Sequence, residues 1–366
     1  MAGLYVHIPF CRRRCLYCDF FSTTALMRKD AYVDALLQEI TERKNEAGEP
    51  IRTIYIGGGT PSQLDSIDVF RILRTIGIDD AEEVTMEVNP ADVTEKYLRE
   101  IRQCGVNRLS IGVQSFKDTL LQTIGRRHNS IQALDAVHIA QAVGFDNISI
   151  DLMYALPGQT MSLWVADIEL ALRLGVQHIS SYGLMYENGT QLTKMRDKGE
   201  ITPIDEDTEN EMYDKLCKRL EEAGFIHYEV SNFALPGYEA KHNSNYWNHT
   251  PYIGVGAAAH SLVGNVRSWN PSHLEKYIRG INKHTLHRQR EKLSERDLYN
   301  ERVMLGLRTN KGIEIPIPTM DRQWTDNESA LLREGLIEQT DDNRIVATQQ
   351  GLHVLNRIIE QLMIDE

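Results

Sequence analysis

Three cysteines fall within eight positions near the start of the chain, with the spacing C-x3-C-x2-C across residues 11–18. Cysteine thiolates are the usual ligands of iron–sulfur clusters, and three sulfurs on one loop can reach three corners of a 4Fe–4S cubane. The fourth iron then stays open for a small molecule, as one position stays open in catalytic metal sites. The spacing therefore predicts a 4Fe–4S cluster held by Cys11, Cys15 and Cys18.

A structural zinc ion is the alternative use of these cysteines. It needs a fourth ligand at suitable spacing, and His7 is a nearby histidine that could supply it. The other two cysteines, Cys104 and Cys217, each stand alone in an apolar helical pattern, and we expect them to be small buried hydrophobes. An odd total of five cysteines argues against a disulfide framework.

Short β-rich runs alternate with amphipathic segments over the first two-thirds of the chain. The helical period is clear at Tyr32, Val33, Leu36 and Ile40, which share one face. The spacing between runs is typical of βα units, and such alternation predicts a parallel sheet covered by helices. We expect strands at residues 4–8, 53–56, 84–88, 108–113, 147–153 and 178–184.

Polar or glycine-bearing residues follow several of these expected strands. In parallel α/β folds, ligands bind beyond the carboxyl ends of the strands. Six units favour a partial (β/α)6 barrel that is open on one side. The residues expected at the ligand-binding end are Gly57, Gly58, Gly59, Thr60, Glu87, Gln114 and Asp151.

The βα rhythm stops near residue 235. We expect a barrel over residues 1–235, a connecting segment over 236–285 and a C-terminal domain over 286–366. In the last of these, helical patterns surround a predicted hairpin with its turn at Asp341-Asp342-Asn343. This order is typical of a winged-helix-like module, which we interpret as a packing domain.

The formal net charge of −12 argues against a nucleic-acid partner, since binding to phosphate backbones needs an excess of Lys and Arg. The N-terminus carries no basic stretch followed by a long apolar run, and the chain has no apolar run of bilayer-spanning length. We therefore expect a cytoplasmic protein.

The cysteine motif after a strand, followed by Gly57-Gly58-Gly59-Thr60-Pro61 after the next strand, resembles the radical-SAM superfamily. The resemblance implies S-adenosylmethionine (SAM) at the open iron and radical chemistry supplied by that cofactor. By position, it assigns SAM contacts to Tyr5, Tyr17, Gly57, Gly58, Gly59, Thr60, Glu87, Gln114, Arg126 and Asp151.

Within that superfamily the chain is similar to the oxygen-independent coproporphyrinogen III oxidases. The similarity runs through residues 5–11, 106–115, 125–128 and 151–158. Two departures stand out: Phe20 occupies the place of the oxidases' fourth cysteine, and the cluster motif begins at residue 11 without their long N-terminal extension. Both match the HemW branch of the family, the heme chaperones.

A third feature is the sequence His242-Asn243-Ser244-Asn245-Tyr246-Trp247, which resembles the His-Asn-x-x-Tyr-Trp motif of the HemW branch. The resemblance implies heme contacts for His242, Asn243, Tyr246 and Trp247, and imidazole is a common axial ligand of heme iron. His249 and His260 compete for that axial role. A packing loop, in which Tyr246, Trp247, Tyr252 and Trp269 seal the barrel, is the alternative.

The resemblance favours a heme chaperone that binds heme as cargo beside a SAM-liganded cluster and passes it to respiratory hemoproteins. The alternative is an oxygen-independent coproporphyrinogen III oxidase, which would decarboxylate a porphyrin precursor; the residue at position 20 disfavours it. The sequence leaves open whether partners bring the protein to a membrane, whether it dimerises and whether a second SAM binds.

Overall fold

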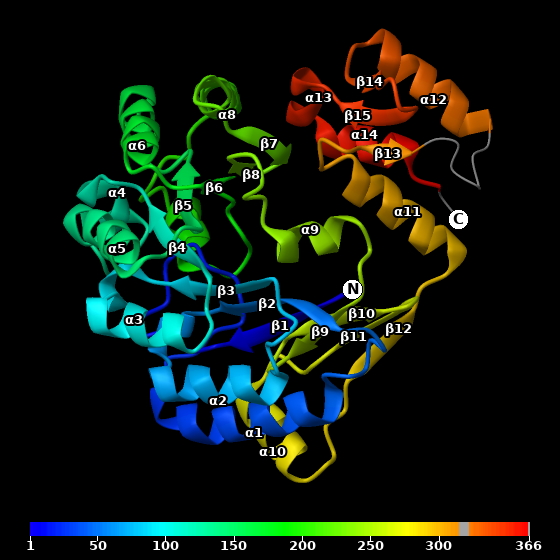
Figure 1. Cartoon of the computed structure of the whole chain (residues 1–366). Coiled ribbons are helices and arrows are strands. Elements are labelled where there is room, and N and C mark those ends of the chain that lie inside the picture. The colour runs from blue at the N-terminus through cyan, green and yellow to red at the C-terminus, as the bar shows by residue number, and fades with distance from the viewer. Residues whose placement is uncertain (315–321, 365–366) are drawn as a thin grey trace.

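The computed structural model describes residues 1–314 and 322–364. Its main feature is a 12-stranded sheet in the order β12-β11-β10-β9-β1-β2-β3-β4-β5-β6-β8-β7 (Figure 1). The strands β1 to β6 pair in parallel in chain order, which confirms the predicted partial barrel. These strands are β1 (Ala2–Ile8), β2 (Ile51–Gly58), β3 (Glu83–Val88), β4 (Arg108–Gln114), β5 (Ile148–Tyr154) and β6 (His178–Gly183).

Helices connect these strands and cover the outside of the barrel, as α1, α2 and α3 do along one side in Figure 1. Several begin at a residue whose side chain caps the first turn; Asn129, for example, forms a capping box with Gln132. The helices are α1 (Lys29–Arg43), α2 (Ser66–Ile76), α3 (Glu95–Gln103), α4 (Asp118–Thr123), α5 (Ser130–Val143), α6 (Met161–Arg173), α7 (Gln191–Asp197) and α8 (Glu206–Glu222).

Alternation along the strands separates the core from the barrel interior. In β4, Leu109, Ile111 and Val113 belong to the main hydrophobic cluster, which the helices complete. The intervening residues Arg108, Ser110, Gly112 and Gln114 line a cavity on the opposite face. The same strands thus supply both the packing that fixes the barrel and the polar side chains inside it.

The predicted connecting segment, residues 236–285, extends the sheet. The strand β9 (Tyr252–Val255) lies parallel to β1 and continues the barrel beyond six strands. It and the three strands that follow it have four residues each, which is too short to give a period. The segment holds α9 (Lys241–Trp247), β9, β10 (His260–Val263), β11 (Val266–Trp269) and α10 (Leu274–Asn282), and β12 (Gln289–Lys292) follows it; β7 (Ile226–Glu229) and β8 (Asn232–Ala234) end the opposite edge.

A buried carboxylate ties this extension to the barrel. Glu39 of α1 is fully buried and accepts hydrogen bonds from Arg43, Asn270 and Tyr277 and from the backbone N–H of Gly256. Buried charges are tolerated when every lone pair has a donor. This network therefore fixes α10 and the end of β9 against α1.

The C-terminal module has its own hydrophobic cluster and a sheet in the order β13-β15-β14, with helices around it (Figure 1). The predicted hairpin is present, and two short helices that meet at Val354 follow it. The predicted boundaries at residues 235 and 285 stay a prediction. The elements are α11 (Glu295–Gly306), β13 (Ile313–Glu314), α12 (Arg322–Arg333), β14 (Ile337–Gln339), β15 (Arg344–Ala347), α13 (Gln349–His353) and α14 (Leu355–Leu362).

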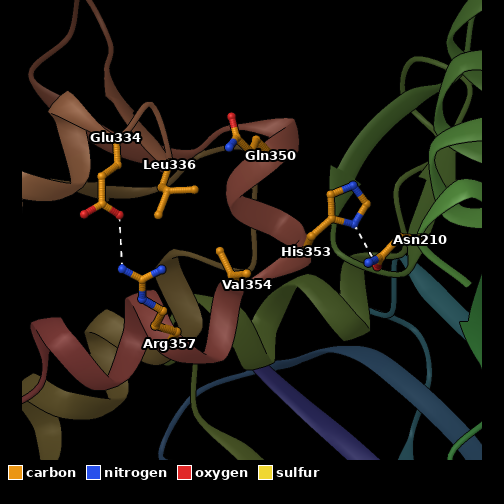
Figure 2. Close-up of a pocket in the computed structure, with 7 residues that line it drawn as sticks. All are labelled: Asn210, Glu334, Leu336, Gln350, His353, Val354 and Arg357. Atoms are coloured by element: carbon orange, nitrogen blue, oxygen red, sulfur yellow. Dashed lines mark hydrogen bonds and ion pairs between the residues drawn. The ribbon is translucent and has the colours of Figure 1, made fainter. Parts of the chain in front are cut away.

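A shallow pocket marks the contact between this module and the barrel (Figure 2). Within it, His353 of α13 bonds through Nδ1 to Asn210 of α8 at 3.0 Å, and its Nε2 lies 2.9 Å from Asp214. Arg357 and Glu334 form an ion pair inside the module. Among the described residues, no helix combines the length and the apolar character needed to cross a bilayer.

Candidate functional site

A cavity of about 530 Å³ opens at the carboxyl ends of the parallel strands and extends into the barrel. It brings together most of the residues that the sequence singled out. They come from the strands β1 to β5, from the loops that follow them and from α9. Those that line it are Cys11, Cys15, Cys18, Tyr5, Tyr17, Gly58, Gly59, Thr60, Glu87, Gln114, Arg126, Asp151 and Asn243. Gly57, His242, Tyr246 and Trp247 do not line it.

The cysteine loop follows β1 and is pinned by its backbone. The N–H of Cys11 donates to the carbonyl of Thr23, so the chain returns to its own start after the loop. All three thiols are free. Two receive hydrogen bonds: the Thr60 hydroxyl lies 3.3 Å from Cys11 Sγ, and Arg126 Nη1 lies 3.5 Å from Cys15 Sγ. A cationic donor beside a sulfur stabilises the thiolate that metal binding requires.

Burial has the opposite effect on the other thiols. It raises the pKa of Cys11, and it raises the pKa of Cys18 to about 11. Without a cation these buried groups therefore stay protonated near neutral pH. A bound metal ion supplies the positive charge that removes the proton. Three unpaired thiols on the wall of one cavity, two of them with donors, form a donor set that fits a 4Fe–4S cluster.

The zinc alternative loses its fourth ligand in this structure. His7 Nδ1 is 3.0 Å from the Tyr5 hydroxyl, and His7 Nε2 is 3.0 Å from the carbonyl of Phe21. Both ring nitrogens are thus in use, and burial lowers the pKa of His7 to about 4. Within residues 1–314 and 322–364, no three His, Cys, Asp or Glu side chains gather as a ready-made site for one metal ion.

The glycine loop lies directly against the cysteine loop. Gly58 has a φ of +117°, and a Cβ on Gly59 would lie 3.0 Å from Cys11 Sγ and 2.9 Å from the carbonyl carbon of Pro9. Only glycine allows this conformation and this approach. Gly57 packs beneath the loop, where a Cβ would meet the ring of Tyr55. The loop thus offers backbone groups to a ligand beside the cysteines.

Two carboxylates face the same cavity. Glu87 Oε1 accepts a hydrogen bond from the Tyr55 hydroxyl at 2.9 Å, and Oε2 accepts one from the N–H of Gly58 at 3.1 Å. Burial, reinforced by the charge of Asp151, raises the pKa of Glu87 to about 7. Burial also raises the pKa of Asp151 to about 6, against the opposing effect of a hydrogen bond from Ser110. The pair is poised to change charge with a ligand.

A strained backbone position aims Gln114 into the cavity. Gln114 has a φ of +68° at an irregularity in the pairing of β4 with β5. Such bulges turn a side chain away from its regular direction and recur beside active sites. Arg126 reaches across to the carbonyl of Gly112 and to Cys15, while its Nε is buried without a partner. Burial raises the pKa of Tyr17, which is therefore a neutral aromatic wall.

The α9 motif lies between the main sheet and the C-terminal module (Figure 1), where it contacts Thr53 and Glu83 near the amino ends of β2 and β3. His242 is 1% exposed, with Nδ1 3.0 Å from the Thr53 hydroxyl and Nε2 2.9 Å from the Tyr246 hydroxyl. Its ring stacks on Tyr55 at 5.5 Å. Burial lowers the pKa of His242 to about 3, so the ring is neutral. Neither nitrogen is open to a ligand in this conformation.

The competing histidines differ in their surroundings. His249 has a φ of +57° and a buried Nε2 without a hydrogen-bond partner, and the indole N–H of Trp247 is likewise unpartnered. His260 stacks on Trp269 between neighbouring strands. Tyr246 packs edge-on against Tyr252. Tyr246 and Trp269 thus pack against other rings of the same segment. Both the packing alternative and the axial assignment stay predictions.

Sequence reasoning missed several cavity residues. Tyr55, Arg108 and Tyr182 line it from β2, β4 and β6, and Met185 is exposed beside them. The signal for the strand residues was their period of two: Arg108 and Ser110 share the inward face with Gln114. Nothing comparable marks Met185, which lies in a loop.

Comparison with known proteins agrees with this geometry. The model of the radical SAM superfamily matches residues 5–171. A heme chaperone HemW of Lactococcus lactis is 35% identical over 99% of this chain and 97% of its own length, and one of Bacillus subtilis is 37% identical over 98% of both. The chain belongs to the HemW family of radical-SAM proteins. A mitochondrial radical S-adenosyl methionine domain-containing protein 1 of Danio rerio is 33% identical over the full chain and 87% of its own length.

A solved structure supports the fold of this HemW-family chain. The coproporphyrinogen III oxidase HemN of Escherichia coli, described as a radical SAM enzyme, superimposes with a TM-score of 0.84 at 23% identity. The match covers 99% of this chain and 90% of the oxidase. It therefore includes the C-terminal module as well as the barrel.

Proposed function

We propose that this HemW-family chain is a heme chaperone, which binds heme and a SAM-liganded 4Fe–4S cluster and delivers the heme to respiratory hemoproteins. The observation that carries the proposal is its full-length similarity, at 35% and 37% identity, to relatives named heme chaperones. The cavity supports the cofactor part of the proposal, because it gathers three unpaired thiols with the glycine loop and two carboxylates.

Each cavity residue has a role in this proposal. Cys11, Cys15 and Cys18 would hold the cluster, which, when bound, supplies an electron for SAM chemistry. Thr60 and Arg126 donate hydrogen bonds to Cys11 and Cys15 and thereby stabilise their thiolates.

The remaining groups would hold SAM. Gly58 and Gly59 allow the ligand's aminocarboxylate to approach the backbone. Glu87 would accept the two ribose hydroxyls, and Tyr17 would cover the adenine and exclude water. Tyr5, Gln114 and Asp151 line the same space. Gly57 would act indirectly, since its lack of a side chain leaves room for Glu87.

Heme binding at the α9 motif would require a local rearrangement. His242 can bind iron only after it leaves Thr53 or Tyr246, because each ring nitrogen already has a partner. Asn243 alone of the four predicted heme contacts reaches the cavity. We therefore propose a closed form of the motif, seen here, and a heme-binding form in which the ring of His242 turns outward.

The oxidase alternative rests on the shared fold, and position 20 speaks against it. Phe20 is 67% exposed and lies on the cavity wall beside the cluster loop. A phenyl ring supplies neither a thiol ligand nor a proton donor. It offers an apolar contact instead, which suits the binding of a large planar ring.

Anaerobic reconstitution tests the proposal. Iron and sulfide are counted, and the EPR spectrum is recorded before and after SAM; heme is then titrated by its Soret band and offered to membranes from heme-depleted cells. We expect four irons per chain, an EPR change with SAM, one bound heme and transfer to apo-cytochromes. The Cys15→Ala variant is compared with Cys217→Ala, which removes a thiol from α8.

The outcomes separate the two functions. Heme that binds but never reaches the apo-cytochromes would remove delivery from the proposal. Formation of protoporphyrinogen from coproporphyrinogen III by the same preparation, with SAM and reductant, would establish the oxidase instead. Membranes also reveal whether respiratory partners recruit the chain to a bilayer.

A further inference from the structure

The cavity extends from the cysteine loop toward the amino ends of the strands, where Arg108 lies in the same register row as Tyr55 and the proposed SAM contact Tyr5. On β4, Arg108, Ser110, Gly112 and Gln114 all line it. Gln114 lies at the carboxyl end of the strand, on the side of the cysteines, and Arg108 is the first residue of the strand. At about 3.3 Å per residue, the two lie roughly 20 Å apart along the strand. Arg108 therefore marks the opposite end of the cavity.

Arg108 is buried without a partner. Its side chain is among the largest in the fully buried core, and the residue is 2% exposed. Its Nε has no hydrogen-bond partner, and within the described ranges the guanidinium forms no hydrogen bond or ion pair. Its positive charge acts from a longer distance on the carboxylate of Asp151, which lines the same cavity, and opposes the rise in the pKa of that carboxyl group. Burying an unpaired charge is costly, and arginine cannot lose its proton to escape that cost. A bound anion would therefore lower the free energy of this buried guanidinium.

Arg43 shows how this fold treats an arginine that serves only packing. It is equally buried, at 2% exposed. Its guanidinium contacts the carboxylates of Glu39 and Glu46, the carbonyl of Gly254 and the hydroxyl of Ser261. Two arginines with the same burial thus differ completely in pairing. The unpaired one faces the cavity, and the paired one does not.

The surroundings of Arg108 favour an acidic ligand with an apolar body. Thr85, its neighbour in register on β3, has a buried hydroxyl that also lacks a partner. Tyr55, Tyr182 and Met153 supply apolar walls to the same cavity. A guanidinium presents two parallel N–H groups that match a carboxylate.

We propose that Arg108 binds a carboxylate group of a ligand that extends to the inner end of the cavity. The inference builds on the proposed function, which provides two sources of that carboxylate: a propionate of heme, or the amino-acid part of a second SAM. The first SAM is already accounted for, because its aminocarboxylate belongs at the cysteine loop.

Four ligands distinguish the sources: heme, heme dimethyl ester, SAM, and methylthioadenosine, which lacks the amino-acid part. Each is titrated into the cluster-loaded wild type, Arg108→Met, and the control Arg52→Met, which removes the same charge from β2 outside the cavity. With a propionate at Arg108, the Arg108→Met variant binds heme at least tenfold more weakly, and binds the ester like the wild type. With a second SAM there, it loses one of two bound SAM molecules and keeps its affinity for heme and methylthioadenosine.

Thermal unfolding distinguishes a ligand-binding role of Arg108 from a purely structural one. An unpaired buried charge destabilises the empty protein, so Arg108→Met should melt at the wild-type temperature or higher, whereas Arg43→Met should melt well below it. Arg108→Lys retains the charge without the paired donors and should restore binding only in part.

Several results would overturn the assignment. One is unchanged binding of all four ligands by Arg108→Met; another is an equal loss in Arg52→Met; a third is a fall in melting temperature like that of Arg43→Met. A wild type that binds heme while Arg108→Met binds it equally well, with SAM stoichiometry unchanged, rejects this inference and leaves the proposed function standing. A wild type that binds neither heme nor SAM rejects both.

Discussion

The cysteine loop and the α9 motif carry the two strongest sequence signals, and the structure treats them in opposite ways. The thiols of Cys11, Cys15 and Cys18 line a cavity and are free. The ring of His242 is buried with both nitrogens in hydrogen bonds. A motif thus shows which chemistry its residues can perform, and the fold decides whether their lone pairs are open to a ligand.

The two regions are physically linked. His242 stacks on Tyr55, and the Tyr55 hydroxyl donates to Glu87, which lines the cavity. A movement of the imidazole removes the support from one face of Tyr55.

Loss of one cluster ligand has the largest expected effect. Cys15→Ala removes a thiolate from a set of three, and two cysteines do not hold a cubane. Iron and sulfide per chain should fall close to zero after reconstitution, and the visible absorption of the cluster should vanish. Cys104→Ala, which changes the C-cap residue of α3, is the matched control and should retain full iron. Full iron in Cys15→Ala would show that the open motif is not the cluster site.

Removal of the Glu87 charge comes second. If Glu87 accepts the ribose hydroxyls, Glu87→Gln loses charged hydrogen bonds of about 1.5–3 kcal/mol, which corresponds to roughly 10- to 100-fold in affinity for SAM. Equilibrium dialysis with labelled SAM measures the change. Glu83→Gln is the control on the same strand, since Glu83 faces α9 and accepts from its first N–H groups. Equal affinity in the wild type and Glu87→Gln would place the ribose elsewhere.

The same residue should make SAM binding depend on pH. The pKa of Glu87 is raised to about 7, chiefly by burial, and the ribose hydroxyls prefer the ionised carboxylate. The competent fraction therefore grows as pH rises through 7, and affinity should increase about tenfold between pH 6 and pH 8. In Glu87→Gln this part of the dependence should disappear. An affinity that falls over this range in the wild type would contradict the assignment.

Loss of a hydrogen bond that holds His242 should shift the α9 motif from its closed form toward the heme-binding form. Thr53→Val removes the hydrogen bond to His242 Nδ1 and the one that Thr53 accepts from Asn245, and it keeps the shape of the side chain. The bond to His242 is worth about 1 kcal/mol, so heme affinity should rise about fivefold, whereas the cost in stability should reflect the loss of both bonds. Soret titration and chemical denaturation measure the two effects. Unchanged heme affinity would mean that the ring of His242 is not the ligand, and His249, whose Nε2 is unpartnered, would be tested next.

The sequence predicted the barrel well because its strands and helices obey simple periods. Each of the six expected strands overlaps a parallel strand of the sheet, and the polar residues at their carboxyl ends line one cavity. The segment of short strands around β9 gave no period, because a strand of four residues contains only two repeats of the two-residue alternation. Its pairing with β1 depends on contacts distant in sequence, which local patterns do not contain.

The sequence also did not show which functional side chains are open to a ligand. His242 and Cys18 have comparable motif support, yet only the three-dimensional neighbours Thr53 and Tyr246 decide that the imidazole is saturated. Arg108 looked like an ordinary strand residue, because nothing local distinguishes a paired from an unpaired buried guanidinium. Pairing is a property of the packed barrel and becomes visible only there.

Phe20 should give the smallest effect and the finest test of the open region. It is 67% exposed at the cavity mouth, so Phe20→Ala should change the free energy of unfolding by no more than about 0.5 kcal/mol and leave the iron content intact. If a planar apolar ligand rests on this ring, heme affinity should still fall two- to fivefold, as expected for one partly covered aromatic contact of about 0.5–1 kcal/mol. The control Met27→Ala removes a side chain that is 98% exposed and should change nothing. Equal heme affinity in both variants would confine the ligand to the barrel interior or to α9, and would leave Phe20 only the role of filling a position that a cysteine would otherwise occupy.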